Sequence, residues 1–395
     1  MNGAEISRPT GDGARLRVPR LRRRIALLVS GLLAFSLSAS ACTGDGTGPR
    51  PTGNATAAPG SREPTPDGTG TASEPPPPVP RVAGTIDLGL QLPWSVVFLP
   101  DGTAVISERD SALLKAVKDG QSTTIRNVPG VVPGGEGGLM GLALSPSFAS
   151  DRYLYLYFTA QNDNRIARLR LEEGDEGLEA GEPEVIFSGI SKASTHNGGR
   201  IRFGPDGFLY VGTGDSQRRD QPQDPNALGG KILRLTTEGR PAPGNPFGEN
   251  PVFSLGHRNV QGLGWDSEGR LWASEFGPDV NDELNLIVPG GNYGWPAVTG
   301  SPGRQGFIDA SVVWPSTSES SPSGLEIIDG TAYLGALRGQ RVWAVPLDGD
   351  RAGNPVSYFT REYGRIRDIA LAPDGTLWAL TNNQNPDSVL VVEVP

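Results

Sequence analysis

A short hairpin pattern that recurs six times is the feature that most constrains the fold of this chain. In each copy an apolar stretch leads into a turn and a second apolar stretch follows, as in residues 95–106 and 201–211. Five turns carry an acidic residue followed by glycine, which accepts the positive φ of a tight hairpin turn, and the sixth is a longer turn through Ser150 and Asp151. The turns centre near 101, 150, 206, 268, 329 and 374, about 45–62 residues apart. Hairpins at this spacing predict an all-β, six-bladed β-propeller with four-stranded antiparallel blades over residues 81–395.

The first 80 residues lack this pattern and predict export and tethering. An arginine-rich start is followed by an uncharged, mostly apolar stretch over residues 25–41, which is shorter than the roughly 20 apolar residues of a membrane span. We therefore interpret residues 1–41 as a signal peptide. Cys42, the only cysteine, follows small residues and predicts a lipidation site, with ordinary cleavage near Ala41 as the alternative. Whether export uses the general or the twin-arginine route stays open.

Residues 42–80 are expected to be a lipid-anchored cysteine followed by a disordered tether. After Cys42 this stretch consists almost wholly of proline, glycine, threonine, alanine and a few charged residues, and it cannot bury enough apolar surface to offset the entropy of ordering. The expected location is extracytoplasmic, as a cell-membrane lipoprotein that contacts the membrane only through its lipid. The formal charge is −9, and residues 1–41 carry a net +5, so the remaining chain carries about −14. Such an acidic domain is a poor fit to nucleic acid.

The repeat also predicts where a functional site lies. His196 and Arg258 each stand ten residues before the turn of their own copy, and Arg365 stands nine residues before its turn. Because strands rise about 3.3 Å per residue, these three residues enter their blades at one level and should converge on one mouth of the channel. Only two histidines exist. We interpret His196 as a candidate general base and His257 as structural.

Two further features at this end indicate an anion and a hard cation. Arg365 and Arg367 are two positions apart in an extended segment, so they point the same way, and Arg258 and Arg338 add to them. Converging guanidiniums suit a ligand with carboxylates, although salt bridges between blades would also explain them. The turn over residues 277–283 is rich in oxygen donors of the kind that calcium prefers, although acidic turns are often simply solvated.

Several ordered motifs together resemble the glucose/sorbosone dehydrogenase family, the soluble aldose dehydrogenases that use pyrroloquinoline quinone (PQQ). The matching strings are Gly-Gly-Leu-Met-Gly-Leu at 137–142, His-Asn-Gly-Gly-Arg at 196–200, Gly-His-Arg-Asn-Val-Gln-Gly-Leu at 256–263, Gly-Pro at 277–278, Asp-Glu-Leu-Asn at 282–285, Asn-Tyr-Gly-Trp-Pro at 292–296 and Arg-Ile-Arg-Asp at 365–368. The resemblance covers essentially the whole domain, from about residue 92 to 381. It implies a secreted quinoprotein that oxidises an aldose at the anomeric carbon to the lactone.

The resemblance also implies roles for individual residues. His196 would be the general base, and Arg258 would stabilise developing charge on the quinone oxygen. The implied contacts to PQQ are made by Asn259, Gln261, Arg338, Arg365 and Arg367. The carbonyls of Gly277 and Pro278 would ligate a calcium ion at PQQ, and Glu283 and Tyr293 would hold a second, structural calcium.

The chain departs from the family pattern at positions that bear on the substrate. Glu136 stands near the sugar where the best-known members carry glutamine, Thr195 replaces an aspartate before the base, and Phe276 replaces a polar residue. Arg338 stands where the family often has lysine, which keeps the charge but changes the geometry. The identity of the sugar, the external electron acceptor, a homodimer and the host's supply of PQQ all stay open.

A binding module and a lactonase are the two functions that compete with the dehydrogenase. A non-catalytic extracellular propeller that binds a partner has no need of His196 together with Arg258, Arg365 and Arg367. A calcium-dependent lactonase would place several carboxylate and asparagine ligands around the channel, whereas arginines are concentrated here. The sequence therefore favours the dehydrogenase.

Overall fold

The computed structural model describes residues 79–175, 177–384 and 386–395. The predicted signal peptide, Cys42 and almost all of the predicted tether lie outside these residues. No helix in the described part of the chain is long and apolar enough to cross a membrane.

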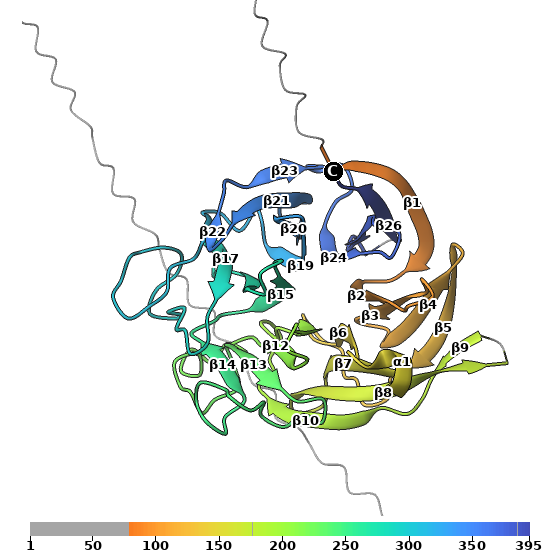
Figure 1. The fold of residues 1–395 in the computed structure, drawn as a ribbon, viewed down its shortest axis with the longest axis horizontal. Coiled ribbons are helices and arrows are strands. Elements are labelled where there is room, and N and C mark those ends of the chain that lie inside the picture. Colours follow the sequence, from red (N-terminus) through yellow and green to blue (C-terminus); the bar gives the residue numbers. More distant parts are fainter. Residues whose placement is uncertain (1–78, 176, 385) are drawn as a thin grey trace, which may run out of the picture. The chain divides into compact units, whose positions relative to one another are not determined.

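The described domain is a ring of six antiparallel sheets, which confirms the predicted six-bladed propeller (Figure 1). Blade 1 contains β2 (Pro93–Phe98), β3 (Ala104–Glu108), β4 (Leu113–Lys118) and β5 (Gln121–Asn127). Blade 2 contains β6 (Leu139–Leu144), β7 (Tyr153–Thr159), β8 (Asn164–Gly174) and β10 (Glu184–Ile190), with the short β9 (Gly177–Ala180) paired to β8. Blade 3 contains β11 (Ile201–Phe203), β12 (Leu209–Gly212), β13 (Lys231–Leu235) and β14 (Val252–Leu255).

The second half of the ring follows the same plan. Blade 4 contains β15 (Val260–Trp265), β16 (Leu271–Glu275), β17 (Asp282–Ile287) and β18 (Val312–Trp314). Blade 5 contains β19 (Pro322–Ile328), β20 (Thr331–Ala336), β21 (Arg341–Asp348) and β23 (Val356–Tyr358), with β22 (Arg351–Ala352) also paired to β21. Blade 6 contains β24 (Ile366–Leu371), β25 (Leu377–Thr381), β26 (Asp387–Glu393) and, as its outer strand, β1 (Arg81–Leu90).

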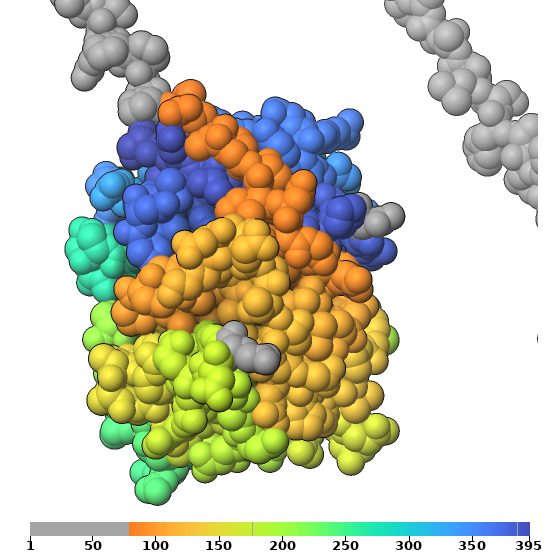
Figure 2. Space-filling view, turned by 90° about the vertical axis from the view of Figure 1, so that its right-hand side faces the viewer, coloured from red at the N-terminus to blue at the C-terminus, as the bar shows by residue number. Residues whose placement is uncertain are grey.

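The ring is closed by pairing the two ends of the domain. Strand β1 runs antiparallel to β26, with Arg81 opposite Glu393. Figure 2 shows the orange β1 segment lying against the dark-blue C-terminal strands. This pairing covers the edge that β26 would otherwise expose.

Six apolar clusters hold the blades together, one between each pair of neighbours around the ring. Strand β7 contributes side chains to two of these clusters. Leu154 and Leu156 pack toward blade 1, whereas Tyr155 and Tyr157 pack toward blade 3. Because a strand between two blades buries both faces, it reads as a continuous apolar run rather than as an alternating one.

The six predicted turns are the first hairpins of the six blades, and they share one end of the ring. Gly102, Gly207, Gly269, Gly330 and Gly375 have positive φ values of 73–86°. The sixth turn is the short helix α1 (Phe148–Asp151). The opposite end, where the inner strands begin, is therefore the end at which the predicted site residues enter.

Most inner strands are irregular near their start, and this irregularity shapes the channel. The pairing register shifts at Trp94 in β2, at Gln261 in β15, at Ser323 in β19 and at Arg367 in β24. A β-bulge leaves one residue unpaired and re-aims its side chain. These residues consequently do not follow the strict alternation of a regular strand.

Candidate active site

Most of the predicted site residues line one cavity of about 310 Å³ at the end where the inner strands begin. Its walls include Glu136, His196, Arg258, Gln261, Gly277, Pro278, Arg338, Arg365 and Arg367. The structure thus brings together His196, Arg258 and Arg365, whose spacing from the turns predicted a common mouth. Asn259 lies behind the wall, and Glu283 and Tyr293 line a separate small cavity.

His196 is held between an anion and a cation. Its Nδ1 lies 2.7 Å from Asp215 Oδ1, and its Nε2 lies 2.9 Å from Arg258 Nη2. A guanidinium can only donate, so this arrangement assigns the Nδ1–H tautomer and leaves the lone pair on Nε2. His196 has a φ of 58°, which is uncommon for a residue other than glycine, and its backbone N–H donates to Glu136 Oε2 at 2.7 Å.

Asp215 is fixed by more than the histidine. Its Oδ2 accepts the Trp295 Nε1–H at 2.8 Å, and its Oδ1 also accepts the backbone N–H of Gln217 at 2.8 Å. Burial alone would raise the pKa of Asp215, but the hydrogen bonds from His196, Gln217 and Trp295 outweigh it and hold the pKa below its ordinary value. Asp215 therefore stays ionised and orients the imidazole.

Arg258 links the histidine to the turn at 277. Its Nη1 donates to the carbonyls of Phe276 at 3.1 Å and Gly277 at 2.5 Å. Burial lowers the pKa of this guanidinium, although the charges of Asp215 and Glu275 act to raise it. Its Nε is buried without a hydrogen-bond partner among the described residues.

The bulged residues form the floor of the cavity. Arg367 Nη1 donates to Gln261 Oε1 at 2.7 Å, and the Arg367 guanidinium lies 5.7 Å from the ring of Trp94. Burial, together with the positive charges of Arg109 and Arg365, lowers the pKa of Arg367 to about 9. This buried cation is surrounded mainly by like charges.

The donors on and behind these walls match an anionic ligand with several acceptor oxygens. Arg258 Nε, Arg367 Nε and Asn259 Nδ2 are buried with no partner among the described residues, although most buried polar groups in proteins are paired. Arg338 donates one bond, to Thr317 Oγ1 at 2.9 Å, and Arg365 has a pKa lowered by burial and by the charges of Arg109 and Arg338. The residues present therefore fit a polycarboxylate such as PQQ.

Oxygen donors stand at the predicted calcium turn. Gly277 and Pro278 line the cavity together with Asp282, whose Oδ1 accepts the Gly277 N–H at 2.9 Å. Burial raises the pKa of Asp282 to about 6. Among the described residues no three side chains of His, Cys, Asp or Glu converge on one point, so a cation here would depend on backbone carbonyls.

Glu283 and Tyr293 meet at a second, much smaller cavity of about 10 Å³. Glu283 faces Glu275, its cross-strand partner, and both carboxylates line this cavity. Burial raises the pKa of Glu283, and the charge of Glu275 raises it further. The Tyr293 hydroxyl is already engaged, because it donates to Leu286 O at 2.6 Å and accepts the Val288 N–H.

His257 has a structural environment. It is fully buried, its ring stacks on Tyr293 with centroids 4.6 Å apart, and its two nitrogens bind Ser254 Oγ and Glu275 Oε2, each at 2.8 Å. It does not line the large cavity.

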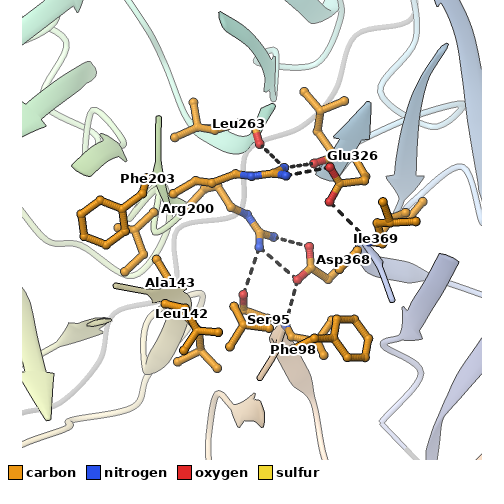
Figure 3. Close-up of a pocket in the computed structure, with 18 residues that line it drawn as sticks. Ser95, Phe98, Leu142, Ala143, Arg200, Phe203, Leu263, Glu326, Asp368 and Ile369 are labelled. Atoms are coloured by element: carbon orange, nitrogen blue, oxygen red, sulfur yellow. Dashed lines mark hydrogen bonds and ion pairs between the residues drawn. The ribbon is translucent and has the colours of Figure 1, made fainter. Parts of the chain in front are cut away.

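A third cavity, of about 290 Å³, lies in the channel at the end that carries the hairpin turns (Figure 3). Between this cavity and the candidate active site, Arg200 binds Asp368 Oδ2 at 3.0 Å, Ser95 Oγ at 3.2 Å and Gln261 O at 2.9 Å. Closer to the turn end of the channel, Arg202 binds Glu326 Oε1 at 2.7 Å. These bonds cross-link the inner strands beneath the site, and they confine the candidate active site to one end of the channel.

Several residues at the site have no role that the sequence alone indicated. Asp215 and Trp295 support the histidine, Arg109 and Trp94 line the cavity, and Arg200 and Asp368 lie beneath it. Asp215 stands in the blade of His196, three residues after the end of strand β12, and an acidic residue there is the one local signal that could have indicated it.

Comparisons with known proteins agree with this geometry. Residues 90–390 match the family model for glucose/sorbosone dehydrogenase. The chain is 30% identical over 334 residues to the aldose sugar dehydrogenase YliI of Escherichia coli, covering 76% of this chain and 90% of that protein. It is 32% identical over 258 residues to quinoprotein glucose dehydrogenase B of Acinetobacter calcoaceticus, covering 56% and 54%.

A solved structure extends the likeness to three dimensions. The PQQ-bound aldose sugar dehydrogenase of Streptomyces coelicolor shares 47% identity, with a TM-score of 0.78 over 81% of this chain and all of that one. Family model, relatives and fold agree, and the chain belongs to the glucose/sorbosone dehydrogenase family.

Proposed function

We propose that this protein oxidises an aldose at its anomeric carbon to the lactone, with PQQ and calcium as cofactors and His196 as the general base. The observation that carries the proposal is the meeting, in one cavity, of an oriented histidine with a cluster of incompletely paired guanidiniums. A base alone or an anion site alone would not single out this reaction. The PQQ-bound relative supports the choice of anion.

PQQ and calcium would be held by different walls. Arg338, Arg365 and Arg367 offer donors to the carboxylates, with Gln261 on the floor and Asn259 behind it. The carbonyls of Gly277 and Pro278 offer oxygen ligands to calcium. When bound, PQQ supplies the acceptor for a hydride, and calcium polarises that acceptor.

The protein's own groups then handle the proton. Oxidation to the lactone removes a hydride from the anomeric carbon and a proton from its hydroxyl. His196 Nε2 carries the lone pair that takes this proton, and Asp215 stabilises the resulting imidazolium. Because Arg258 Nη2 donates to Nε2 in the structure, the sugar hydroxyl has to displace that bond, which frees Arg258 to stabilise negative charge at the reacting centre.

A second calcium between Glu275 and Glu283 is part of the proposal. Two buried carboxylates face one small cavity, and a divalent cation would relieve their repulsion. Glu136, at the mouth, is the residue proposed to select the sugar. Export, lipidation of Cys42 and an external electron acceptor complete the proposed setting.

The test combines PQQ titration with dye reduction across a panel of aldoses, for the wild type and His196→Gln. The proposal expects PQQ to bind both proteins, and PQQ-dependent dye reduction to be lost in the variant. Binding of PQQ without oxidation of any aldose by the wild type would overturn the substrate class. Absence of PQQ binding would overturn the dehydrogenase proposal altogether.

A further inference from the structure

Lys231, at the start of β13, is a fully buried lysine that the proposed reaction does not use. Its Nζ lies 2.6 Å from Gln221 O, 3.1 Å from Pro222 O and 2.8 Å from Gly229 O. Burial lowers the pKa of Lys231 to about 7. Three carbonyls accept from Nζ, and only the protonated form has three N–H donors, so the geometry assigns an ammonium. Gly229 O has no other hydrogen-bond donor among the described residues.

These carbonyls belong to the long connection between β12 and β13, residues 213–230, which carries Asp215 near its start. Apart from turns and the bridge between Gly214 and Asn259, this connection has no regular secondary structure. Backbone hydrogen bonds close its single turns, and the ammonium ties three of its carbonyls to the start of β13. A buried cation is retained in proteins where its donors are satisfied.

The connection contains Asp215 and is hydrogen-bonded to the backbone of His196 and Arg258. The Asp215 N–H donates to Arg258 O at 2.7 Å, and the Ser216 N–H donates to His196 O at 3.1 Å. Pro222 O, one of the three acceptors of Lys231, also accepts the Gly256 N–H at 2.9 Å, two residues before Arg258. The lysine is thus bonded to the backbone that places both the anion and the cation on either side of the imidazole.

We infer that Lys231 is a positioning residue, an internal ammonium that fixes the connection over residues 213–230 and, through it, the Asp215–His196–Arg258 arrangement. This inference rests on the proposed function, since it assigns a consequence to His196 as a base. It also makes a claim about the protein without PQQ, namely that the imidazole tautomer depends on Lys231.

The first experiment measures the tautomer directly in the PQQ-free protein, by nitrogen NMR of the histidine rings. Only two histidines exist, so His257→Gln assigns the signals. The wild type should show His196 with its proton on Nδ1, and Lys231→Met should show a mixture of tautomers. An unchanged His196 signal in a folded Lys231→Met protein would overturn the inference whatever the enzyme's activity.

The second experiment separates positioning from cofactor binding. Lys231→Met should lower kcat by about 100-fold, the scale expected for a misplacement of about 1 Å, while the Kd for PQQ stays near the wild-type value. Lys118→Met, which removes an exposed lysine paired with Asp101, is the control and should change neither quantity. Loss of PQQ affinity equal to the loss of kcat would indicate general disruption and contradict the inference.

A chemical rescue covers the case in which Lys231→Met does not fold. Lys231→Ala, purified with propylammonium chloride, has room for the missing ammonium, and activity should rise with propylammonium but not with 1-butanol or with sodium chloride at equal ionic strength. In the double variant Lys231→Ala/Asp215→Asn, propylammonium should restore little, because the two residues act in one chain of contacts. Equal rescue by butanol would show that only packing was lost, which would refute a role for the charge. If the wild type itself neither binds PQQ nor oxidises aldoses, the proposed function fails, and the NMR result still decides the role of Lys231.

Discussion

Replacing Asp215 by asparagine perturbs the histidine without changing the volume of the site. Asp215 Oδ1 accepts two donors, from His196 and Gln217, and Oδ2 accepts one, from Trp295. An asparagine has one acceptor oxygen and one NH₂ group, so it cannot satisfy all three donors. With its oxygen toward His196, the NH₂ group opposes the Trp295 N–H. With its oxygen toward Trp295, the NH₂ group opposes Gln217 and forces the histidine proton to Nε2, where it meets Arg258.

Both orientations predict measurable costs. One buried donor without an acceptor costs about 1–3 kcal/mol of folding free energy. The lost attraction between the carboxylate and the imidazolium is about 4 kcal/mol for unit charges about 4 Å apart at an effective dielectric constant of about 20. That value corresponds to about a 10³-fold loss of rate, since each 1.36 kcal/mol is about tenfold. We therefore expect kcat to fall by about 10²- to 10³-fold.

The assay is steady-state dye reduction by PQQ-loaded Asp215→Asn, together with chemical unfolding and PQQ titration. The Kd for PQQ should be unchanged, because Asp215 does not line the large cavity. Asp206→Asn is a matched control, since Asp206 is a turn carboxylate that binds Arg234 and Tyr210 at the opposite end of the ring. A folded, PQQ-bound Asp215→Asn protein whose kcat stays within about threefold of the wild type would show that Asp215 does not orient the base.

Four further results are expected. The pKa of Asp215 in the folded protein lies below its ordinary value of 3.8. The ionised carboxylate therefore stabilises the fold at pH values above 3.8, and this stabilisation is lost as the pH falls through the lower pKa of the folded protein. The difference in unfolding free energy between the wild type and Asp215→Asn should accordingly become smaller in acid. Arg367→Gln should weaken PQQ binding by about 2 kcal/mol, or about 30-fold in Kd, in equilibrium titrations. Asp368→Ala leaves Arg200 buried without its partner and should cost about 3–5 kcal/mol in denaturant unfolding, more than Glu326→Gln, which affects the more exposed pair with Arg202. Removal of calcium by a chelator should lower both the Tm and the dye-reduction rate, and added calcium should restore them.

The fold could be predicted because its signals are local. Five of the six blades begin with a hairpin turn in which Gly102, Gly207 or a counterpart takes a positive φ. The burial of both faces of strands such as β7 produces long apolar runs. Distances counted back from these turns were sufficient to bring His196, Arg258 and Arg365 to one mouth.

The supporting residues could not be predicted because their contacts are not local in sequence. Trp94 reaches the cavity floor through a register shift, and alternation with a period of two cannot reveal where a strand bulges. Gln261 and Arg367 lie at similar shifts, and the sequence indicated both as ligand contacts but not the hydrogen bond between them. Trp295 meets Asp215 across 80 positions of sequence, and Arg200 meets Asp368 across 168. Such contacts depend on how whole blades pack against one another, and the pattern of a single segment carries no information about that packing.

The central claim is that this cavity binds PQQ and that His196 takes the proton during oxidation of an aldose. The most direct measurement mixes PQQ-loaded protein with excess aldose in the absence of a dye and follows the absorbance of the bound cofactor together with formation of the lactone. We predict one equivalent of reduction and of lactone in the wild type, and retained PQQ with neither reduction nor lactone in His196→Gln. Reduction of bound PQQ by His196→Gln at the wild-type rate, or a wild type that does not hold PQQ, would contradict it.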